Sequence, residues 1–161
     1  MQKDRINLLM VDDELEFLQS MAKRLTVRGF NVIAVDRGAK AIEAARNHAI
    51  DIAVVDLKMP GLDGDETIQA LLKEHMFLEV VILTGHGSFQ SAEQFTQKGV
   101  FHYAQKPCDL DRLLILLTEA FKRRVMKRMN IDRKEMEKLL KPVEGGSTMA
   151  ILEKIRELDR A

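Results

Sequence analysis

The chain has 161 residues, of which 46% are hydrophobic and 31% are charged. This length allows one domain of ordinary size with a short appendage and argues against a receptor fused to an effector enzyme. The balance of apolar and charged side chains is that of a globular protein and excludes a disordered one.

The net charge of zero conceals an uneven distribution of charge along the chain. Up to Ala120 there are 13 Lys and Arg residues against 18 Asp and Glu residues, whereas from Phe121 onward there are 12 against 7. The sequence therefore predicts an acidic body, residues 1–120, followed by a basic extension, residues 121–161.

Short apolar runs rich in β-branched residues alternate with amphipathic stretches along the body. Continuous apolar runs are typical of strands buried on both faces, and apolar residues three or four positions apart are typical of helices. Their strict alternation predicts an α/β fold, a doubly wound (βα)5 parallel sheet with right-handed crossovers. In chain order the strands are Ile6–Val11, Asn31–Val35, Asp51–Asp56, Glu79–Thr84 and Val100–Ala104, and the helices include Leu15–Leu25, Ala41–Ala45, Ile68–Leu72, Ala92–Phe95 and Leu110–Leu117.

The extension is predicted to be helical. Phe121, Val125 and Met129 continue the apolar series of the fifth helix at four-residue steps, so this helix is expected to run past the body. Asp132 and Glu135 have capping-box spacing and predict the start of a new helix. Further along lie a helix end at Lys141–Pro142, a flexible joint at Gly145–Ser147 and a short last helix with Ile151, Ile155 and Leu158 on one face. That last helix is too short to be stable alone and should pack on something.

The basic run Lys122–Arg128 raises the question of DNA binding. Residues 121–161 are too few for an effector domain of the usual kind, and the sequence offers no helix-turn-helix with a recognition helix. The alternative is a solvated face near a helix C-terminus, where cations are favoured. We therefore expect no DNA binding, and an extension that docks a partner, pairs two subunits or folds back on the oppositely charged body.

Reactive side chains follow the C-terminal ends of four predicted strands, and these ends meet at one edge of a parallel sheet. In chain order they are Asp12 and Asp13, Asp56, Thr84, and Lys106 with Pro107. Each has a structural alternative when taken alone, such as a capping box between Asp13 and Glu16. Because several separate loops contribute to the set, a functional site is the stronger interpretation.

The chemistry of this set is coherent. Three carboxylates at close range repel one another unless a cation lies among them. Oxygen ligands of this kind suit Mg²⁺, with Mn²⁺ as an alternative. A carboxylate beside Mg²⁺ can act as a nucleophile on phosphorus and form an acyl phosphate. The Lys106 ammonium and the Thr84 hydroxyl would then bind the phosphoryl oxygens as charge develops.

Together these motifs resemble the receiver domains of two-component response regulators. The resemblance extends from Arg5 to Ala120 and keeps the order and spacing of every motif. It implies the CheY-like strand order 2-1-3-4-5. The matching residues are the pair Asp12-Asp13, the run Asp56–Gly64, Thr84-Gly85, and Tyr103 three residues before Lys106-Pro107.

The resemblance implies a role for each residue of the metal site. Asp56 would be the phosphoacceptor and Asp13 a direct Mg²⁺ ligand. Asp12 would support the metal through water, and the backbone carbonyl of Lys58 would be a further ligand. Lys58 and His86, two residues after Asp56 and Thr84, occupy positions that influence the attacking water in this family, so they are candidates for tuning the lifetime of the phosphoryl group.

The remaining roles implied by the resemblance concern the switch. Lys106 would pair with Asp56 or its phosphoryl group, and Thr84 would bind a phosphoryl oxygen. Tyr103 would move into the space that Thr84 vacates, which changes the face made by the fourth helix, fifth strand and fifth helix. The Lys106–Pro107 peptide bond is expected to be cis.

The implied partners follow from this chemistry. The donor would be a phosphohistidine on a sensor histidine kinase or a phosphotransfer protein. Output would pass to a downstream protein or to a homodimer, formed through the switching face or the C-terminal helices. The protein would take part in its own phosphorylation and dephosphorylation without being an enzyme with an independent substrate. An alternative is that the chain is the receiver fragment of a larger transcriptional or enzymatic regulator.

Two other classes of protein are weighed against this interpretation. Phosphatases of the haloacid-dehalogenase type also form a phosphoaspartate, but they require a second Asp two residues after the nucleophile, where this chain has Lys58. A flavodoxin-type carrier needs a phosphate-cradling loop after the first strand, and Asp12–Glu14 would repel phosphate there.

The cellular location is predicted from the absence of a disulfide partner, a membrane-spanning run and a secretory signal in the sequence. Cys108 stands alone and cannot form an internal disulfide, which favours a reducing compartment. No apolar run is long enough to span a bilayer, and the N-terminus does not have the pattern of a secretory signal. We expect a bacterial signalling protein that resides in the cytoplasm and has no contact with membranes.

Overall fold

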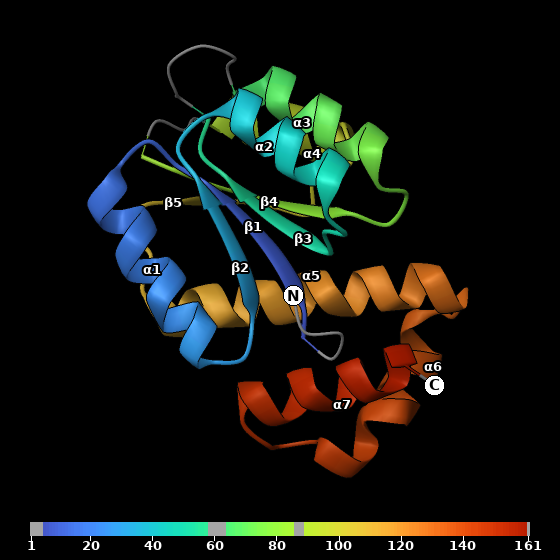
Figure 1. Cartoon of the computed structure of the whole chain (residues 1–161). Helices are drawn as coiled ribbons and strands as arrows, with labels where there is room; N and C mark the ends of the chain where they lie inside the picture. The colour runs from blue at the N-terminus through green and yellow to red at the C-terminus, as the bar shows by residue number, and fades with distance from the viewer. Residues whose placement is uncertain (1–4, 58–63, 86–88, 161) are drawn as a thin grey trace.

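The core of the molecule is a five-stranded parallel sheet in the computed structural model, which describes residues 5–57, 64–85 and 89–160. The strand order is β2-β1-β3-β4-β5, which confirms the order implied by the resemblance. Leu8 of β1 pairs with Val32 of β2 on one side and with Ile52 of β3 on the other. The strands are β1 (Asn7–Val11), β2 (Asn31–Val35), β3 (Ile52–Val55), β4 (Glu79–Thr84) and β5 (His102–Gln105) (Figure 1).

Helices cover both faces of this sheet, as the alternating pattern predicted. Residues from α1 and α5 share one hydrophobic cluster with the sheet, and residues from α2, α3 and α4 share the other. Successive residues of the buried strands enter opposite clusters, which explains why the apolar runs are continuous. The helices are α1 (Leu15–Val27), α2 (Gly38–Asn47), α3 (Gly64–Glu74), α4 (Phe89–Gln97) and α5 (Leu110–Met129).

The extension is helical, as predicted. α5 continues without a break to Met129 and ends at Asn130, whose φ of 54° gives a left-handed cap. α6 (Arg133–Leu140) is capped by Asp132, whose carboxylate accepts a hydrogen bond of 2.8 Å from the N–H of Glu135. A 3₁₀ turn (Lys141–Val143) and the glycine-containing joint then lead to α7 (Thr148–Arg160). No helix within the described ranges is both long and apolar enough to cross a membrane.

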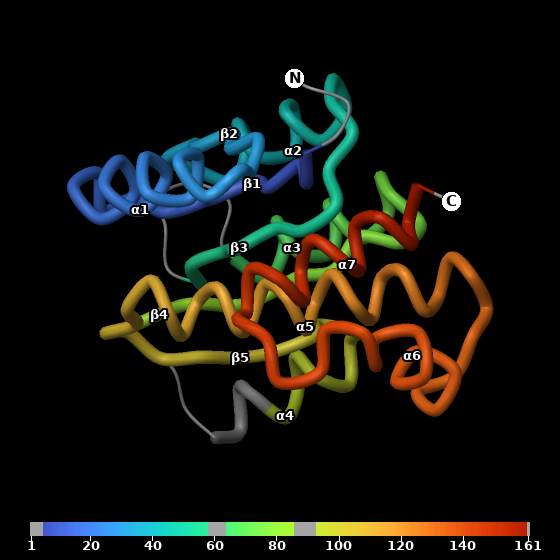
Figure 2. The backbone as a smooth tube through the Cα atoms, turned by 90° about the horizontal axis from the view of Figure 1, so that it is seen from below, coloured from blue at the N-terminus to red at the C-terminus, as the bar shows by residue number. Residues whose placement is uncertain are grey.

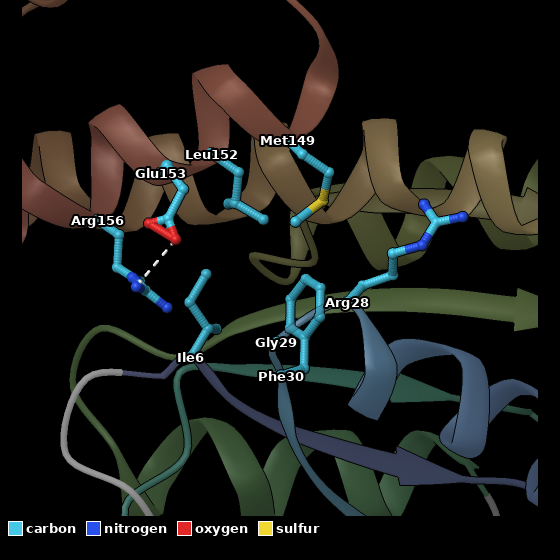
Figure 3. Close-up of a pocket in the computed structure, with 8 residues that line it drawn as sticks. All are labelled: Ile6, Arg28, Gly29, Phe30, Met149, Leu152, Glu153 and Arg156. Atoms are coloured by element: carbon cyan, nitrogen blue, oxygen red, sulfur yellow. Dashed lines mark ion pairs between the residues drawn. The ribbon is translucent and has the colours of Figure 1, made fainter.

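The last helix folds back and packs beside α5 (Figures 1 and 2). Leu152 and Ile155 of α7 are buried in the same cluster as Ile6 and Phe30 of the body, and Met136 of α6 joins them. Figure 3 shows the small pocket that remains at this contact, with Leu152 facing Ile6 and Phe30. Among the expected arrangements of the extension, the structure therefore has the one that folds back on the body.

The basic run is held by two acidic residues at the N-terminal edge of the sheet. Glu79, the first residue of β4, is fully buried and lies 3.1 Å from Arg123 Nε and 3.0 Å from Lys127 Nζ. Asp51, which precedes β3, lies 3.1 Å from Arg124 Nη2. The run is therefore not simply a solvated face, because ion pairs with the buried Glu79 and the partly buried Asp51 hold these three cations against the body.

A further ion pair joins α5 to α7. Arg128 of α5 bonds Asp159 of α7. Burial raises the pKa of Glu79 above its ordinary value, whereas the hydrogen bond from Lys127 and the charge of Arg123 lower it. The cations of α5 therefore offset part of the cost of placing a carboxylate at the buried start of a strand.

Replacing Ile155 by Ala tests the packing of α7. The side chain is fully buried, so its truncation should lower the free energy of unfolding by about 3 kcal/mol. Urea unfolding followed by circular dichroism measures this cost. Leu139→Ala, at an exposed position of α6, is the matched control and should cost less than about 1 kcal/mol. Equal midpoints for the two variants would contradict the packing.

Candidate functional site

The predicted site residues come together at the C-terminal edge of the sheet. Asp12 follows β1 and Asp56 follows β3, and both are buried. Together with the exposed Asp13 they place one carboxylate oxygen each within 4.8 Å of one another. Thr84 closes β4 and Lys106 follows β5 at the same edge. The strand ends thus converge as expected for a parallel sheet.

Backbone hydrogen bonds carry the ladder one residue beyond each strand and so fix these positions. The N–H of Asp12 donates to the carbonyl of Val35 at 3.1 Å, and that of Asp56 donates to the carbonyl of Val11 at 3.0 Å. The N–H of Lys106 donates to the carbonyl of Thr84 at 2.9 Å. Each reactive side chain is therefore mounted on backbone that belongs to the sheet, which limits its freedom.

Gly64 at the start of α3 lets that helix approach the end of β3. A Cβ atom at this position would lie 2.5 Å from Leu57 Cα and 2.8 Å from the carbonyl oxygen of Asp56. The Gly64 N–H donates to the carbonyl of Leu57 at 2.9 Å. A residue with a side chain would push the helix away from the end of β3, so the close approach requires glycine.

Lys106 supplies a positive charge among three carboxylates. Its Nζ lies 2.7 Å from Asp12 Oδ2 and 2.8 Å from Glu14 Oε1, and 3.5 Å from Asp56 Oδ2. The side chain is 12% exposed, and its ammonium lies 4.5 Å from the centroid of the Phe17 ring. The side chain of Lys106 is therefore largely enclosed between the acidic cluster and α1.

Glu14 and Phe17 belong to this site, although sequence reasoning assigned them no role there. Glu14 is the N-cap residue of α1, yet its side chain makes no cap hydrogen bond and reaches Lys106. The structural alternative of a capping box between Asp13 and Glu16 is therefore not what forms, because the N-cap residue is Glu14. The signal available in the sequence was position: Glu14 directly follows the acidic pair at the same edge of the sheet.

Burial and charge act in opposite directions on these groups. Burial raises the pKa of Asp12, and the negative charge of Asp56 adds to this, whereas bonds from Lys106 and from the N–H of Glu14 lower it. Partial burial lowers the pKa of Lys106, but its bonds with Asp12 and Glu14 outweigh this and raise it overall. The ammonium is thus charged at neutral pH and offsets the repulsion among the carboxylates.

Thr84 bonds Asp56, and Tyr103 of the neighbouring strand stacks on α4. The buried Thr84 Oγ1 donates to Asp56 Oδ1 at 2.7 Å. Tyr103 of β5 is partly buried and stacks on Phe95 of α4, with ring centroids 6.4 Å apart. The Lys106–Pro107 peptide bond is cis. Lys58 and His86, the candidates for tuning the phosphoryl lifetime, lie outside the described residues.

Comparison with known proteins identifies the family. Residues 8–118 match the family described as the response regulator receiver domain. The chain belongs to this family. The transcriptional regulatory protein GlrR of Escherichia coli K12 is 34% identical over 114 residues, which is 71% of this chain and 26% of that protein. An NtrX-like response regulator of Rickettsia bellii is 30% identical over 160 residues, 97% of this chain and 33% of that protein.

Solved structures agree with the family and the fold of this receiver. A response regulator receiver domain from Clostridium thermocellum is 30% identical with a TM-score of 0.67, over 74% of this chain and 96% of that one. A CheX-CheY-BeF3-Mg complex from Borrelia burgdorferi matches with 28% identity and a TM-score of 0.62, over 77% of this chain and 89% of that one. The chain spans only about a quarter to a third of the curated relatives it matches.

Replacing Lys106 by Met tests the charge balance of the site. The variant leaves two buried carboxylates without their ammonium, so it should lose about 3 kcal/mol of unfolding free energy at neutral pH. The folded-state pKa of Asp12 is already raised, so folding takes up protons and stability rises as pH falls through that pKa. Without Lys106 the pKa rises further, and the variant should recover stability on acidification more than the parent does.

Urea unfolding at neutral pH and at about pH 5 measures both effects. Lys98→Met is the matched control, because Lys98 pairs with Asp65 on an exposed surface at 3.2 Å and should cost less than about 1 kcal/mol. A loss in Lys106→Met that does not shrink at the lower pH would contradict the proposed charge balance.

Proposed function

We propose that this receiver accepts a phosphoryl group on Asp56 from the phosphohistidine of a sensor histidine kinase or a phosphotransfer protein. The observation that carries the proposal is the convergence of a buried carboxylate, a hydroxyl and an ammonium at one sheet edge. Asp56 lies beside both Thr84 and Lys106, and two more carboxylates lie within 4.8 Å of it. The protein would have no independent substrate and would not be an enzyme in its own right.

The donor set fits a Mg²⁺ ion, or Mn²⁺ in its place. Asp12, Asp13 and Asp56 offer carboxylate oxygens close enough to share one ion, and hard oxygen ligands suit Mg²⁺. When bound, the ion would neutralise and orient the phosphoryl oxygens. The family likeness to a protein solved with BeF3 and Mg supports this assignment. The Lys58 carbonyl, a further expected ligand, lies outside the described residues.

Asp56, Thr84 and Lys106 each have a different role in the proposed phosphoryl transfer. A carboxylate oxygen of Asp56 attacks phosphorus, the bond from phosphorus to the donor imidazole nitrogen breaks, and the imidazole takes the electron pair and leaves. The Thr84 hydroxyl, now bonded to Asp56, would turn to a phosphoryl oxygen. Lys106 would pair with the same group and stabilise its charge as the transfer proceeds.

Protein contact is the output that we propose. If Thr84 moves toward the phosphoryl group, space opens beside Tyr103, whose ring already stacks on Phe95 of α4. A rearrangement there would change the face formed by α4, β5 and α5, which a downstream protein or a second copy would recognise. Output through DNA binding by the basic run has less support, because Arg123, Arg124 and Lys127 are engaged with Glu79 and Asp51.

A second candidate is that the chain is the receiver part of a larger transcriptional regulator. The Rickettsia bellii relative aligns over 160 residues, beyond the residue 118 at which the family match ends, and is about three times as long. In such a protein the helical extension would connect the receiver to the domain that it controls.

Phosphorylation is tested by intact mass spectrometry after incubation with Mg²⁺ and acetyl phosphate. The parent should gain one phosphoryl group, and Asp56→Asn should gain none because it lacks the nucleophilic carboxylate. Asp111→Asn, at an exposed position of α5, is the control and should behave like the parent. If the folded parent accepts nothing from acetyl phosphate or from a phosphohistidine donor, the proposal is wrong and a constitutive binding module replaces it.

Metal binding is tested by isothermal titration calorimetry with Mg²⁺. Asp13→Asn should weaken Mg²⁺ binding by at least about tenfold, since even outer-shell partners of metals contribute that much. Glu16→Gln is the control, because it removes a nearby exposed charge from α1 without touching the acidic cluster. Equal affinities for the two variants would mean that Asp13 is no ligand.

A further inference from the structure

Lys106 lies closer to two other carboxylates than to the proposed acceptor. Its Nζ is 2.7 Å from Asp12 and 2.8 Å from Glu14, against 3.5 Å from Asp56. The ammonium is therefore drawn toward the α1 side of the site. To pair closely with a phosphoryl group on Asp56, it has to move in the opposite direction.

Glu14 differs from Asp12 in its relation to the acidic cluster. Asp12 belongs to the group of carboxylates that could hold a divalent ion, and such an ion would compete with Lys106 for it. Glu14 is not in that group and its side chain is 62% exposed. A cation in the cluster would therefore repel Lys106 from Asp12 but leave Glu14 free to hold it.

The local structure of α1 supports this orientation of Glu14. An N-cap residue commonly bonds the first turn of its helix through its side chain, but Glu14 makes no such bond and extends to Lys106. Its own N–H donates to Asp12 Oδ1 at 2.9 Å, which fixes the backbone from which the side chain extends. Phe17, one turn further along α1, lies against the same ammonium.

We propose that Glu14 is a positioning residue that holds Lys106 away from Asp56 and thereby restrains formation of the phosphorylated state. This inference rests on the proposed function of Asp56. Each phosphorylation event would exchange the ion pair between Lys106 and Glu14 for one between Lys106 and the phosphoryl group. Removal of the Glu14 charge would favour the phosphorylated form by the strength of the pair that no longer has to break.

The test uses BeF3⁻ as the probe, at saturating Mg²⁺. Tyr103 is the only Tyr of the chain, which has no Trp, so its fluorescence reports on the switch region alone. In Glu14→Gln the half-saturating BeF3⁻ concentration should fall about two- to fivefold, the range expected for a partly exposed ion pair. Glu16→Gln, which removes a charge from the same helical turn, should match the parent.

A conservative variant separates positioning from helix stability. Glu14→Asp retains the charge and introduces a good N-cap side chain, but it is too short by one methylene group to hold Lys106 in the same place. It should therefore raise the melting temperature and still lower the half-saturating BeF3⁻ concentration, as Glu14→Gln does. If the half-saturating BeF3⁻ concentration changed in step with the melting temperature, the role of Glu14 would be structural and the inference would be wrong.

A readout without metal completes the test. In the Mg²⁺-free protein, the side-chain ammonium NMR signal of Lys106, assigned with Lys106→Arg, should shift in Glu14→Gln and stay in place in Glu16→Gln. If the parent binds BeF3⁻ but Glu14→Gln binds it no more tightly, the inference about Glu14 is wrong and the proposed function stands. A parent that neither binds BeF3⁻ nor accepts a phosphoryl group overturns the proposed function, and the inference with it.

Discussion

The position of one ammonium group determines what this sheet edge can do. Asp12 and Asp56 are buried at the ends of the adjacent strands β1 and β3, where two carboxylates would otherwise repel each other strongly. Lys106 lies within 3.5 Å of both. Its backbone continues the pairing of β5 with β4, so the charge is placed by the sheet rather than by a loose loop. The proposed roles of the Thr84 hydroxyl and the Tyr103 ring depend on this arrangement of charges.

Opposite charges also tie α5 to the other edge of the sheet. Asp51 and Asp56 flank β3, and Glu79 and Thr84 are the first and last residues of β4. At the C-terminal edge, Asp56 and Thr84 bond each other, and Lys106 lies just before α5. At the N-terminal edge, Asp51 and Glu79 bind the cations of the second half of α5. The helix that forms part of the proposed output face is therefore held by ion pairs at the N-terminal edge of the strands that carry the site.

Most of the fold could be predicted from the sequence, because continuous apolar runs and helical spacing reflect burial directly. The convergence of Asp12, Asp56, Thr84 and Lys106 followed from topology, since parallel strands present their C-terminal ends together. The partners of the basic run could not be foreseen, because Asp51 and Glu79 are distant in sequence and resemble ordinary strand-flanking residues. The role of Glu14 depends on side-chain reach, which spacing alone does not reveal. Opposite charge left several arrangements of the extension open until packing of Ile155 decided between them.

The continuity of α5 across residue 120 has a practical consequence for anyone who excises this receiver. A cut at residue 118, where the family match ends, would sever a 20-residue helix in its middle. It would strip Glu79 and Asp51 of their counter-charges and uncover Ile6 and Phe30 to solvent. Such a truncated protein would be prone to aggregate. A fragment that ends at Arg160 keeps these contacts intact and is the better starting point for expression and labelling.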